Sequence, residues 1–568
     1  MTFSQVVQKA DSVSNSTPSY ELQRAIPFVF AVVVSLLVAA PWLAPGFLFG
    51  TDWPGPRRFD FPSNISSAIP LQVVLALISR VVGSEWTGKL LVFAIVFGAA
   101  WTAFHAAPTA SLIGRVAGAT LFVFNPFVFG RLHYGQLYLL AAYALLPWAA
   151  HRLRLERTLH STRGGLWFGV SAALVGVFSP HLLLVVSVLW VATLAADLLA
   201  TKDRRRSALS LAVAAGTTLL LSSYWLVPLL LGRGAEAGVI AGTGAGQLQV
   251  YAAVSDRDLG VMPNLLGLFG FWAENSGRFT SMKDFVPAWP LALAMLIAVC
   301  TAGALAALRR GDDRLRAWVA GLIVAGAVGL ILEMGVSNPL TSGLVRWLDS
   351  VVPLYRGMRD AGKWAALLAL VYSQLLSLGV SAILDWIHRA RLPAGQVDWL
   401  ASTAVGVLIA LPLFYGNGLL FGMHGEIKPS AYPEGWYAAD RALAADPHPH
   451  RTLFLPWHLY MGLSFVHNEN RVIGSPAPTF FTVPVVVSSD PEIGVAPPDN
   501  PDQRAISGLV RQGSSGDWSR VLADRDIKYV LVAREVDWKS YDFLHQTSYL
   551  SLVSDYGSIT LYRNMLVA

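Results

Sequence analysis

The first segment with residue types suited to chemistry directly follows an apolar run near the start of the chain. It reads GTDWPGPRR over residues 50–58 and contains Asp52, Arg57 and Arg58. A carboxylate can accept a proton from a sugar hydroxyl, and a guanidinium can bind two phosphate oxygens at once. We predict Asp52 as a catalytic base beside a lipid phosphate held by Arg57 and Arg58. The alternative is a solvated turn whose arginines extend along a membrane boundary.

A second cluster of cations directly precedes another apolar run. Arg356, Arg359 and Lys363 fall within eight residues, and Asp360 can balance only one of their charges. Such a cluster just outside a membrane span is a compact anion site. We therefore predict that the three cations bind the phosphate of a lipid-linked donor and that Asp360 contacts the substrate. The alternative is that they only anchor the chain to lipid headgroups.

A polar turn, NPFVFGRLHYGQ at 125–136, separates two apolar runs. Asn, Arg, His and Gln side chains there can hydrogen-bond to a sugar, and tyrosine rings offer faces on which a sugar ring can stack. The alternative is an aromatic belt at the membrane interface around a capped helix turn. The predicted substrate-binding residues are Asn125, Arg131, His133, Tyr134 and Gln136, with Tyr138 as a second stacking face.

Two weaker candidates lie farther along the chain. His181 follows Ser179-Pro180 in another turn and is predicted to contact substrate, although a lone histidine is more often structural. Asp256 and Asp258 are two positions apart, and such a pair could share a divalent cation with a lipid phosphate. Because an ordinary turn also explains this pair, we predict no metal site and no cofactor, and we keep the divalent cation as an alternative.

The composition excludes several classes of protein. Of the 568 residues, 54% are hydrophobic and 14% are charged, with a mean hydropathy of +0.50, whereas soluble domains carry about 25% charged residues. These values exclude a soluble enzyme, a disordered chain and a coiled coil. The single cysteine, Cys300, lies in an apolar run, which excludes a disulfide framework and a cysteine-based metal or redox centre.

The net charge of +6 is unevenly distributed. Residues 422–568 hold 12 of the 42 basic residues and 16 of the 36 acidic ones, so the basic excess belongs to residues 1–421. A basic excess in the apolar part of a chain indicates how its helices are oriented in a membrane and is compatible with an anionic ligand. We therefore predict the lipid bilayer as a partner and no nucleic acid.

Apolar stretches of about 20 residues are long enough to cross a bilayer as helices, which satisfy their backbone hydrogen bonds internally. A shorter stretch at 68–83 carries Arg80 and predicts a helix at the interface or packed within the protein. The eleven predicted spans are 25–45, 89–106, 111–130, 134–151, 166–179, 181–200, 207–231, 287–308, 317–335, 363–386 and 399–421.

Basic residues cluster in loops that fall on one side of the membrane if these spans alternate. By the positive-inside rule that side is cytoplasmic, which predicts the cytoplasmic membrane with residues 422–568 outside. The loops on the outer side are long, and long loops without strong secondary structure are usually functional. The basic loops are 151–165, 201–206, 309–316 and 387–398, and the outer loops are 46–88, 232–286 and 336–362.

The composition changes abruptly after residue 421, where charged residues and short β-type runs appear. We predict two domains, a multi-span membrane domain over 1–421 and an extracytoplasmic soluble α/β domain over 422–568. The fold class is therefore an α-helical polytopic membrane protein with a C-terminal α/β domain. The predicted strands are 451–457, 482–487, 527–533 and 558–562, and the predicted helices of this domain are 433–445 and 501–512.

Short motifs are spread over nearly the whole chain. They are Asn125-Pro126-Phe127 with Gly135-Gln136 and Leu146-Pro147-Trp148, Tyr224-Trp225 with Pro228, Arg359-Asp360 with Lys363-Trp364, and Leu455-Pro456-Trp457-His458. Together with the acidic first outer loop they resemble the GT-C superfamily of integral-membrane glycosyltransferases. Within it, the pattern is similar to YfhO-type membrane proteins and, more distantly, to the membrane half of actinobacterial arabinofuranosyltransferases. The superfamily's first-loop acid often has an acidic neighbour, whereas Asp52 stands alone until Asp60.

This resemblance implies a glycosyltransferase that takes its sugar from a polyprenyl phosphate at the outer face of the membrane, with Trp225 in the substrate site. The acceptor would be a cell-envelope glycan, glycolipid or protein. One alternative is a transporter or flippase of lipid-linked sugars, and another is a non-catalytic membrane scaffold that binds glycan. The small number of ionisable residues inside the predicted spans favours the enzyme over the transporter.

Overall fold

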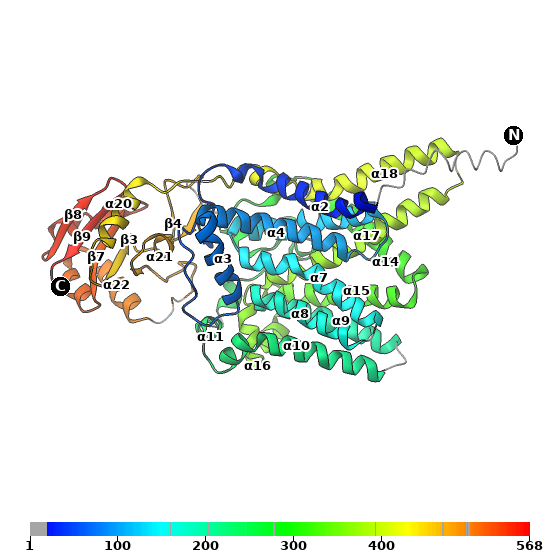
Figure 1. Cartoon of the computed structure of the whole chain (residues 1–568), viewed down its shortest axis with the longest axis horizontal. Helices are drawn as coiled ribbons and strands as arrows, with labels where there is room; N and C mark the ends of the chain where they lie inside the picture. Colours follow the sequence, from blue (N-terminus) through cyan, green and yellow to red (C-terminus); the bar gives the residue numbers. More distant parts are fainter. Residues whose placement is uncertain are drawn as a thin grey trace.

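The computed structural model of the chain describes residues 20–159, 161–200, 204–244, 246–276, 279–391, 393–467, 471–495, 497 and 500–568. A bundle of long helices forms one end of the molecule, and a β-sheet region forms the other (Figure 1). This arrangement confirms the predicted fold class, a polytopic helical membrane protein with a C-terminal α/β region.

Within the described ranges, eight helical segments are long and apolar enough to cross a membrane. Their backbone groups bond within the helix, as a bilayer requires. These segments are α2 (Tyr20–Ala39), α4 (Ser84–Ala106), α5 (Leu112–Val123) continued by α6 (Pro126–Tyr134), α10 (Arg204–Leu230), α14 (Trp289–Arg310), α15 (Asp313–Met334), α17 (Ala365–Arg389) and α18 (Ala394–Tyr415).

The other three predicted spans are also helices of the bundle, α7 (Leu137–Leu159), α8 (Thr162–Phe178) and α9 (Pro180–Ala200) (Figure 1). α8 has only 17 residues, and the second half of α7 carries several arginines, so these helices are less apolar or shorter than an independent span. They pack against one another and against α10 and α15. The count of eleven crossings stays a prediction.

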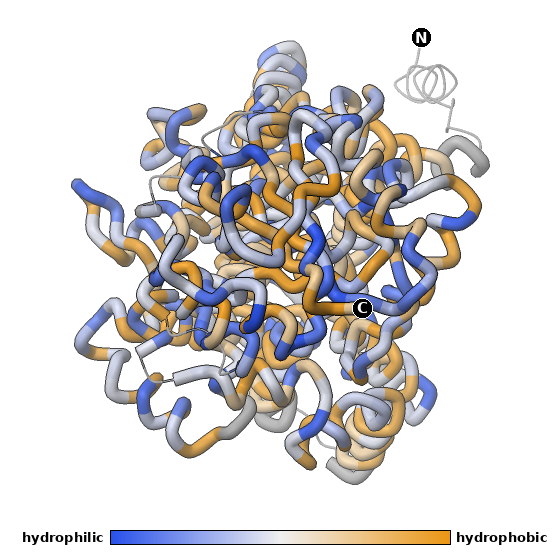
Figure 2. The backbone as a smooth tube through the Cα atoms, turned by 90° about the vertical axis from the view of Figure 1, so that its left-hand side faces the viewer, coloured by the Kyte–Doolittle hydropathy of each residue, from blue (hydrophilic) through white to orange (hydrophobic). Residues whose placement is uncertain are grey.

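The ends of the bundle differ in character. The connections from α14 to α15 and from α17 to α18 lie at the end away from the sheet, and both belong to the basic loops (Figure 1). The sheet end holds the long loops with their short helices α3 (Ile69–Val82), α11 (Ala235–Ala241) and α16 (Pro339–Val351). α3 confirms the helix expected at 68–83. Viewed from the sheet end, hydrophilic and hydrophobic segments interleave (Figure 2).

The C-terminal region contains a five-stranded mixed sheet in the order β6-β3-β7-β9-β8. β3 pairs in parallel with β6 and β7, and β9 pairs antiparallel with β7 and β8. α20 covers one face, and α22 and α23 cover the other, so the central strand β7 is buried at every position. All four predicted strands are confirmed. The elements are β3 (Arg451–Leu455), β6 (Val485–Val486), β7 (Ile527–Ala533), β8 (Leu550–Asp555), β9 (Ile559–Asn564), α20 (Glu434–Ala444), α22 (Pro501–Gln512) and α23 (Trp518–Ala523).

The first outer loop is built into this C-terminal region. β1 (Phe49–Gly50) and β2 (Trp53–Pro54) form a hairpin with Thr51 and Asp52 at its tip. The Gly474 N–H donates to the Thr51 carbonyl at 2.9 Å. The tip of the hairpin therefore lies between the helical bundle and the part of the chain that we predict to be a separate domain.

Candidate active site

A cavity of about 1040 Å³ lies where the hairpin meets the helices. Seven of the predicted site residues form part of its wall, and much of the remaining wall is apolar and comes from α8 to α11. A concave surface with a few polar groups at one place and apolar side chains elsewhere is typical of a ligand site. The predicted residues in the wall are Asp52, Arg58, Gln136, Tyr138, His181, Trp225 and Lys363, and the apolar ones include Phe178, Leu183, Leu184, Leu226, Leu229, Val239 and Ile240.

Asp52 is held in place by three contacts from two parts of the chain. Its backbone N–H donates to the Tyr134 carbonyl at 2.7 Å. Gln136 Nε2 donates to one carboxylate oxygen at 3.1 Å, and the Tyr460 hydroxyl donates to the other at 3.0 Å. The carboxylate is open to the cavity, and protein surrounds it on its other sides.

Two glycines allow the hairpin to approach α6 this closely. Gly135 ends α6 in the left-handed region, with φ of +81°, and a Cβ atom there would lie 2.8 Å from the Cβ of Trp53. A Cβ atom on Gly50 would lie 2.7 Å from the Cα of Gly135. Any larger residue at either position would separate Asp52 from Gln136.

A buried ion pair orients Gln136. Arg131 Nη1 donates to Gln136 Oε1 at 2.9 Å, and Arg131 forms a bidentate pair with Asp360 at 2.5 and 3.2 Å. Arg131 is 1% exposed and Asp360 is 5% exposed. Because the amide oxygen of Gln136 accepts from Arg131, its amide nitrogen faces Asp52. Arg131 and Asp360, both predicted to contact substrate, thus lie beside Gln136, where they pair with each other and Arg131 also bonds to Gln136.

The surroundings of Asp52 have opposing effects on its proton affinity. Burial raises the pKa of Asp52, while the hydrogen bonds from Gln136 and Tyr460 and the Arg131 charge act to lower it, and the net pKa lies above the ordinary value. For Asp360, burial acts in the same upward direction, but the charges of Arg131 and Lys363 and the hydrogen bond from Arg131 together act downward, and the net pKa lies below the ordinary value. The pKa shifts of the two carboxyls therefore have opposite directions, and the raised pKa makes Asp52 the stronger base of the two.

Lys363 projects toward the cavity from η6 (Ala361–Trp364), just before α17. Among the described residues, its ammonium group has no hydrogen-bond or ion-pair partner, although the charges of Asp360 and Asp52 lie near it. His181 also lines the cavity at the start of α9, with Nδ1 3.4 Å from the Ser179 hydroxyl. These groups give one part of the cavity the donors that an anionic or sugar ligand requires.

Trp225 is 3% exposed and lies in the cavity wall. Its indole N–H makes no hydrogen bond to any part of the chain that the structure describes. A buried indole N–H normally has a partner, so this donor is directed to a ligand or to water.

The other two cations of the predicted cluster lie elsewhere. Arg359 donates to Gln247 and lies over the Tyr251 ring, 4.9 Å from its centroid. Arg356 is exposed at the surface. The three neighbouring cations therefore have three different environments, and only Lys363 of these three belongs to the cavity wall.

Arg57 and Arg58 also separate. Arg57 pairs with Asp440 of α20 at 2.6 Å and lies over the Tyr437 ring, 4.8 Å from its centroid. Arg58 lines the cavity and pairs with the exposed Asp60 at 2.7 Å. Arg57 thus fastens the first outer loop to the C-terminal region, while Arg58 stays accessible to a ligand.

Three residues of the predicted polar turn have structural contacts. Asn125 caps α6 by accepting the Val128 N–H at 3.0 Å. His133 is buried, and the Tyr134 ring packs edge-on against Trp272 with centroids 5.5 Å apart. The side chains of Asn125, His133 and Tyr134 lie outside the cavity wall.

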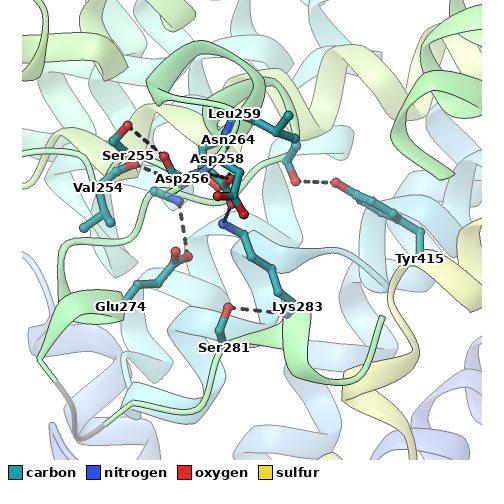
Figure 3. A network of polar contacts seen from close by, with 12 residues as sticks. Val254, Ser255, Asp256, Asp258, Leu259, Asn264, Glu274, Ser281, Lys283 and Tyr415 are labelled. Carbon is teal, nitrogen blue, oxygen red and sulfur yellow. Dashed lines mark hydrogen bonds and ion pairs between the residues drawn. The ribbon is translucent and has the colours of Figure 1, made fainter. Parts of the chain in front are cut away.

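Figure 3 shows the predicted carboxylate pair, which lies outside the cavity wall. Lys283 Nζ lies 2.6 Å from an Asp256 carboxylate oxygen, and Asp256 also accepts the N–H groups of Asp258 and Leu259 at 3.0 Å, which closes a turn. Asp258 is exposed, and burial raises the pKa of the nearby Glu274 to about 7. Asp256 therefore already has an internal cation. No three His, Cys, Asp or Glu side chains of the described residues form a metal-binding group, and the divalent cation stays an untested alternative.

Tyr460 is a residue of the site that the sequence motifs do not contain. It begins β4 (Tyr460–Gly462), more than 400 positions from Asp52, and only the fold brings the two together. The motif Leu455-Pro456-Trp457-His458 lies just before it and was the available signal. Trp53 and Tyr138, whose rings lie 6.4 Å apart, also line the cavity.

No family model matches the chain, and no curated protein matches it. Solved structures do match. The arabinofuranosyltransferase AftD from Mycobacteria has a TM-score of 0.64 at 17% identity, over 95% of this chain and 40% of that protein. Two structures of a mutant of that enzyme have TM-scores of 0.61 and 0.51 at 16% and 15% identity, over 96% and 95% of this chain and 42% and 41% of theirs.

The chain therefore spans about two fifths of the length of the enzyme that it matches. At this level of identity the likeness concerns the fold. The fold is GT-C-like, as the sequence motifs imply, and it carries several membrane-spanning helices.

Proposed function

We propose that this chain, with its GT-C-like membrane fold, is a membrane glycosyltransferase that transfers a sugar from a polyprenyl-phosphate donor to a hydroxyl of a cell-envelope acceptor. One observation carries the proposal. The Asp52 carboxylate and the Lys363 ammonium line the same cavity of about 1040 Å³, whose wall continues over apolar side chains of α9, α10 and α11. The name of the matched enzyme, a glycosyltransferase, supports the same reaction class.

The donor would use both the polar and the apolar part of this cavity. Leu226 and Leu229 of α10 belong to the wall, while Leu220 and Leu230 of the same helix are exposed on the surface of the bundle. A helix with one face to the cavity and another to lipid lets a prenyl chain stay in the bilayer while its phosphate reaches Lys363. Arg58 and His181 supply further donors in the same wall.

The proposed reaction is a single displacement. The acceptor hydroxyl gives its proton to Asp52, and its oxygen forms a bond to the anomeric carbon of the donor sugar. The bond from that carbon to the phosphate oxygen breaks, and its electron pair leaves with the polyprenyl phosphate. Lys363 offsets the charge on the leaving phosphate, and Asp52 later releases the proton to water. A divalent cation at the phosphate is the alternative source of positive charge.

The proposed location is the cytoplasmic membrane, with residues 422–568 on the outer face. The acceptor would be a glycan, glycolipid or protein of the cell envelope, and the sugar would come from a lipid carrier made on the inner side. The basic loops at the end of the bundle away from the sheet support this orientation.

Binding of polyprenyl phosphate to purified protein in nanodiscs tests the donor site. Lys363→Ala is expected to weaken binding by about 10- to 100-fold, the equivalent of a charge-assisted hydrogen bond of roughly 1.5 to 3 kcal/mol. Lys363→Arg should retain most of the affinity. Arg356→Ala, at an exposed neighbouring cation, is the matched control and should bind as the wild type does. Equal affinity in all four proteins would contradict the proposal.

The same preparations separate the enzyme from its two alternatives. Given a panel of polyprenyl-phosphate sugars carrying arabinose, mannose, glucose or galactose, together with a cell-envelope fraction that supplies acceptor hydroxyls, a glycosyltransferase transfers the sugar and releases polyprenyl phosphate. A transporter or a scaffold binds the same lipids but does not release polyprenyl phosphate from them.

A further inference from the structure

Beside Asp52, but outside the cavity wall, lies a group of side chains that the donor does not use. We call Tyr251, Trp272 and Arg359 the aromatic patch. The Tyr251 and Trp272 rings meet edge to face with centroids 4.9 Å apart, and the Arg359 guanidinium lies 4.9 Å from the Tyr251 centroid. The Trp272 ring packs against the Tyr134 ring with centroids 5.5 Å apart, and the Tyr134 carbonyl accepts the Asp52 N–H at 2.7 Å, so the patch and Asp52 share Tyr134 as a neighbour.

The aromatic patch is firmly supported. Arg359 Nη1 donates to Gln247 and, at 3.2 Å, to the Thr243 hydroxyl, both of which are buried. Trp272 also packs against Tyr134, with centroids 5.5 Å apart. The three side chains therefore keep their positions without a ligand.

Several polar groups of the patch nevertheless make no hydrogen bond to the part of the chain that the structure describes. Among the described residues, the Tyr251 hydroxyl, the Trp272 indole N–H and the Nε and Nη2 groups of Arg359 have no hydrogen-bond partner. All three side chains are half-buried. Rigid aromatic faces with unpaired donors at their edges suit a ring that carries many hydroxyl groups.

The patch suits a neutral sugar better than a phosphate. The charge of Arg359 is shared with the Tyr251 ring and lies near the anionic Asp52 and Asp360, which would repel a second anion. Lys363, whose ammonium group has no partner among the described residues, belongs instead to the cavity wall. The carboxylate of Asp52 is thus adjacent to two surfaces of different chemistry.

We propose that the aromatic patch is the acceptor subsite and that it binds a saccharide unit, so that the acceptor is a glycan or a glycolipid. A sugar ring lies against Tyr251 and Trp272, Arg359 donates to its hydroxyls, and one hydroxyl is presented to Asp52. This assignment rests on the proposed function and adds the class of the second substrate to it. The step itself is the displacement described above, in which that hydroxyl loses its proton to Asp52.

Saccharide binding tests the assignment without a turnover assay. Purified protein in nanodiscs is titrated with arabinotetraose, mannotetraose and maltotetraose, and each titration is followed by saturation-transfer NMR. The wild type is expected to bind at least one of them, and Trp272→Ala and Arg359→Ala should each lower that affinity at least fivefold. Tyr251→Phe should retain most of it, because the ring face remains. Tyr549→Ala, at an exposed tyrosine of the C-terminal sheet, is the control.

Binding of polyprenyl phosphate to the same variants distinguishes this assignment from the donor site. Trp272→Ala and Arg359→Ala should bind polyprenyl phosphate within twofold of the wild type. Failure of the wild type to bind any of the three saccharides would overturn the acceptor subsite, as would wild-type affinity in both variants. Loss of polyprenyl-phosphate affinity in Arg359→Ala would assign the patch to the donor and also overturn it. None of these outcomes depends on Lys363, whose effect on donor binding tests the proposed function by itself.

Discussion

Both oxygens of the Asp52 carboxylate accept hydrogen bonds, one from Gln136 and one from Tyr460. These bonds favour the charged form, whereas burial favours the neutral form and raises the pKa above the ordinary value. A carboxylate with a raised pKa is a stronger base than a free aspartate. The proton affinity of Asp52 is therefore set by neighbours from both halves of the chain.

The Tyr460 hydroxyl offers a direct test of that balance. Tyr460→Phe removes a donor that stabilises the charged carboxylate, so the pKa of Asp52 should rise and the acid limb of kcat/KM should move to higher pH. A lost hydrogen bond of roughly 0.5 to 1.5 kcal/mol corresponds to about half a pH unit to one unit. The measurement is the pH profile of polyprenyl-phosphate release, with Tyr549→Phe as the control. A shift to lower pH, or none, would show that Tyr460 does not act on Asp52.

The ion pair of Arg131 and Asp360 predicts a large effect on stability. Arg131→Met leaves Asp360 as a buried carboxylate without its bidentate partner, which should lower the free energy of unfolding by about 3 to 5 kcal/mol. The double variant Arg131→Met with Asp360→Asn should regain much of that loss. Thermal unfolding of the detergent-solubilised protein provides the comparison, and equal melting temperatures for wild type and Arg131→Met would count against a structural role of the pair.

At the scale of elements, the position of the β1–β2 hairpin depends on its close contact with the neighbouring helix α6. Gly135 has a positive φ, and a Cβ atom there would meet Trp53 at 2.8 Å. Gly135→Ala should displace the hairpin tip and lower transfer by at least tenfold while polyprenyl-phosphate binding stays near normal, since a small misplacement of a base costs much of its effect. Gly508→Ala in α22, where a Cβ atom meets nothing within 4 Å, is the control. Normal transfer by Gly135→Ala would mean that the hairpin tolerates the shift.

Sequence patterns predict the elements well where periodicity is strong. The long apolar runs became helices, and IKYVLVA at 527–533 became the buried strand β7 because a strand covered on both faces is apolar at every position. β8 was not predicted, because its side chains after Leu550 are mostly exposed and show no apolar alternation. Tyr460 was missed for a different reason: its role depends on how β4 meets the hairpin, and no local pattern contains that contact.

For the candidate site, too, some residues could be found from sequence patterns and others only from the fold. Asp52 and Lys363 were found from charges at the edges of apolar runs, and both line the cavity. Arg57 and Arg359 have the same charges in similar positions, but the fold directs them to Asp440 and to Tyr251. Charge and spacing therefore identify the polar rim of the bundle, while only packing separates ligand-facing cations from those that fasten loops together.

For the whole molecule, the arrangement predicts which segments face outward. In a Cys300→Ser background, a cysteine replacing the exposed Asp517 should react with an impermeant thiol reagent in intact cells or spheroplasts. A cysteine replacing Arg310, the last residue of α14, should react only after permeabilisation. The reverse labelling would put the cavity on the cytoplasmic side and would overturn the proposed location of the acceptor.

The most direct test of the proposed chemistry is the turnover of Asp52→Asn. The variant keeps the size of the side chain and should bind polyprenyl phosphate as the wild type does, because Lys363 and the apolar wall are unchanged. Its rate of sugar transfer from a polyprenyl-phosphate donor should fall by a factor on the order of 100 to 10,000, the usual contribution of a general base. A well-folded Asp52→Asn protein with near-normal transfer would contradict Asp52 as the base and with it the central claim.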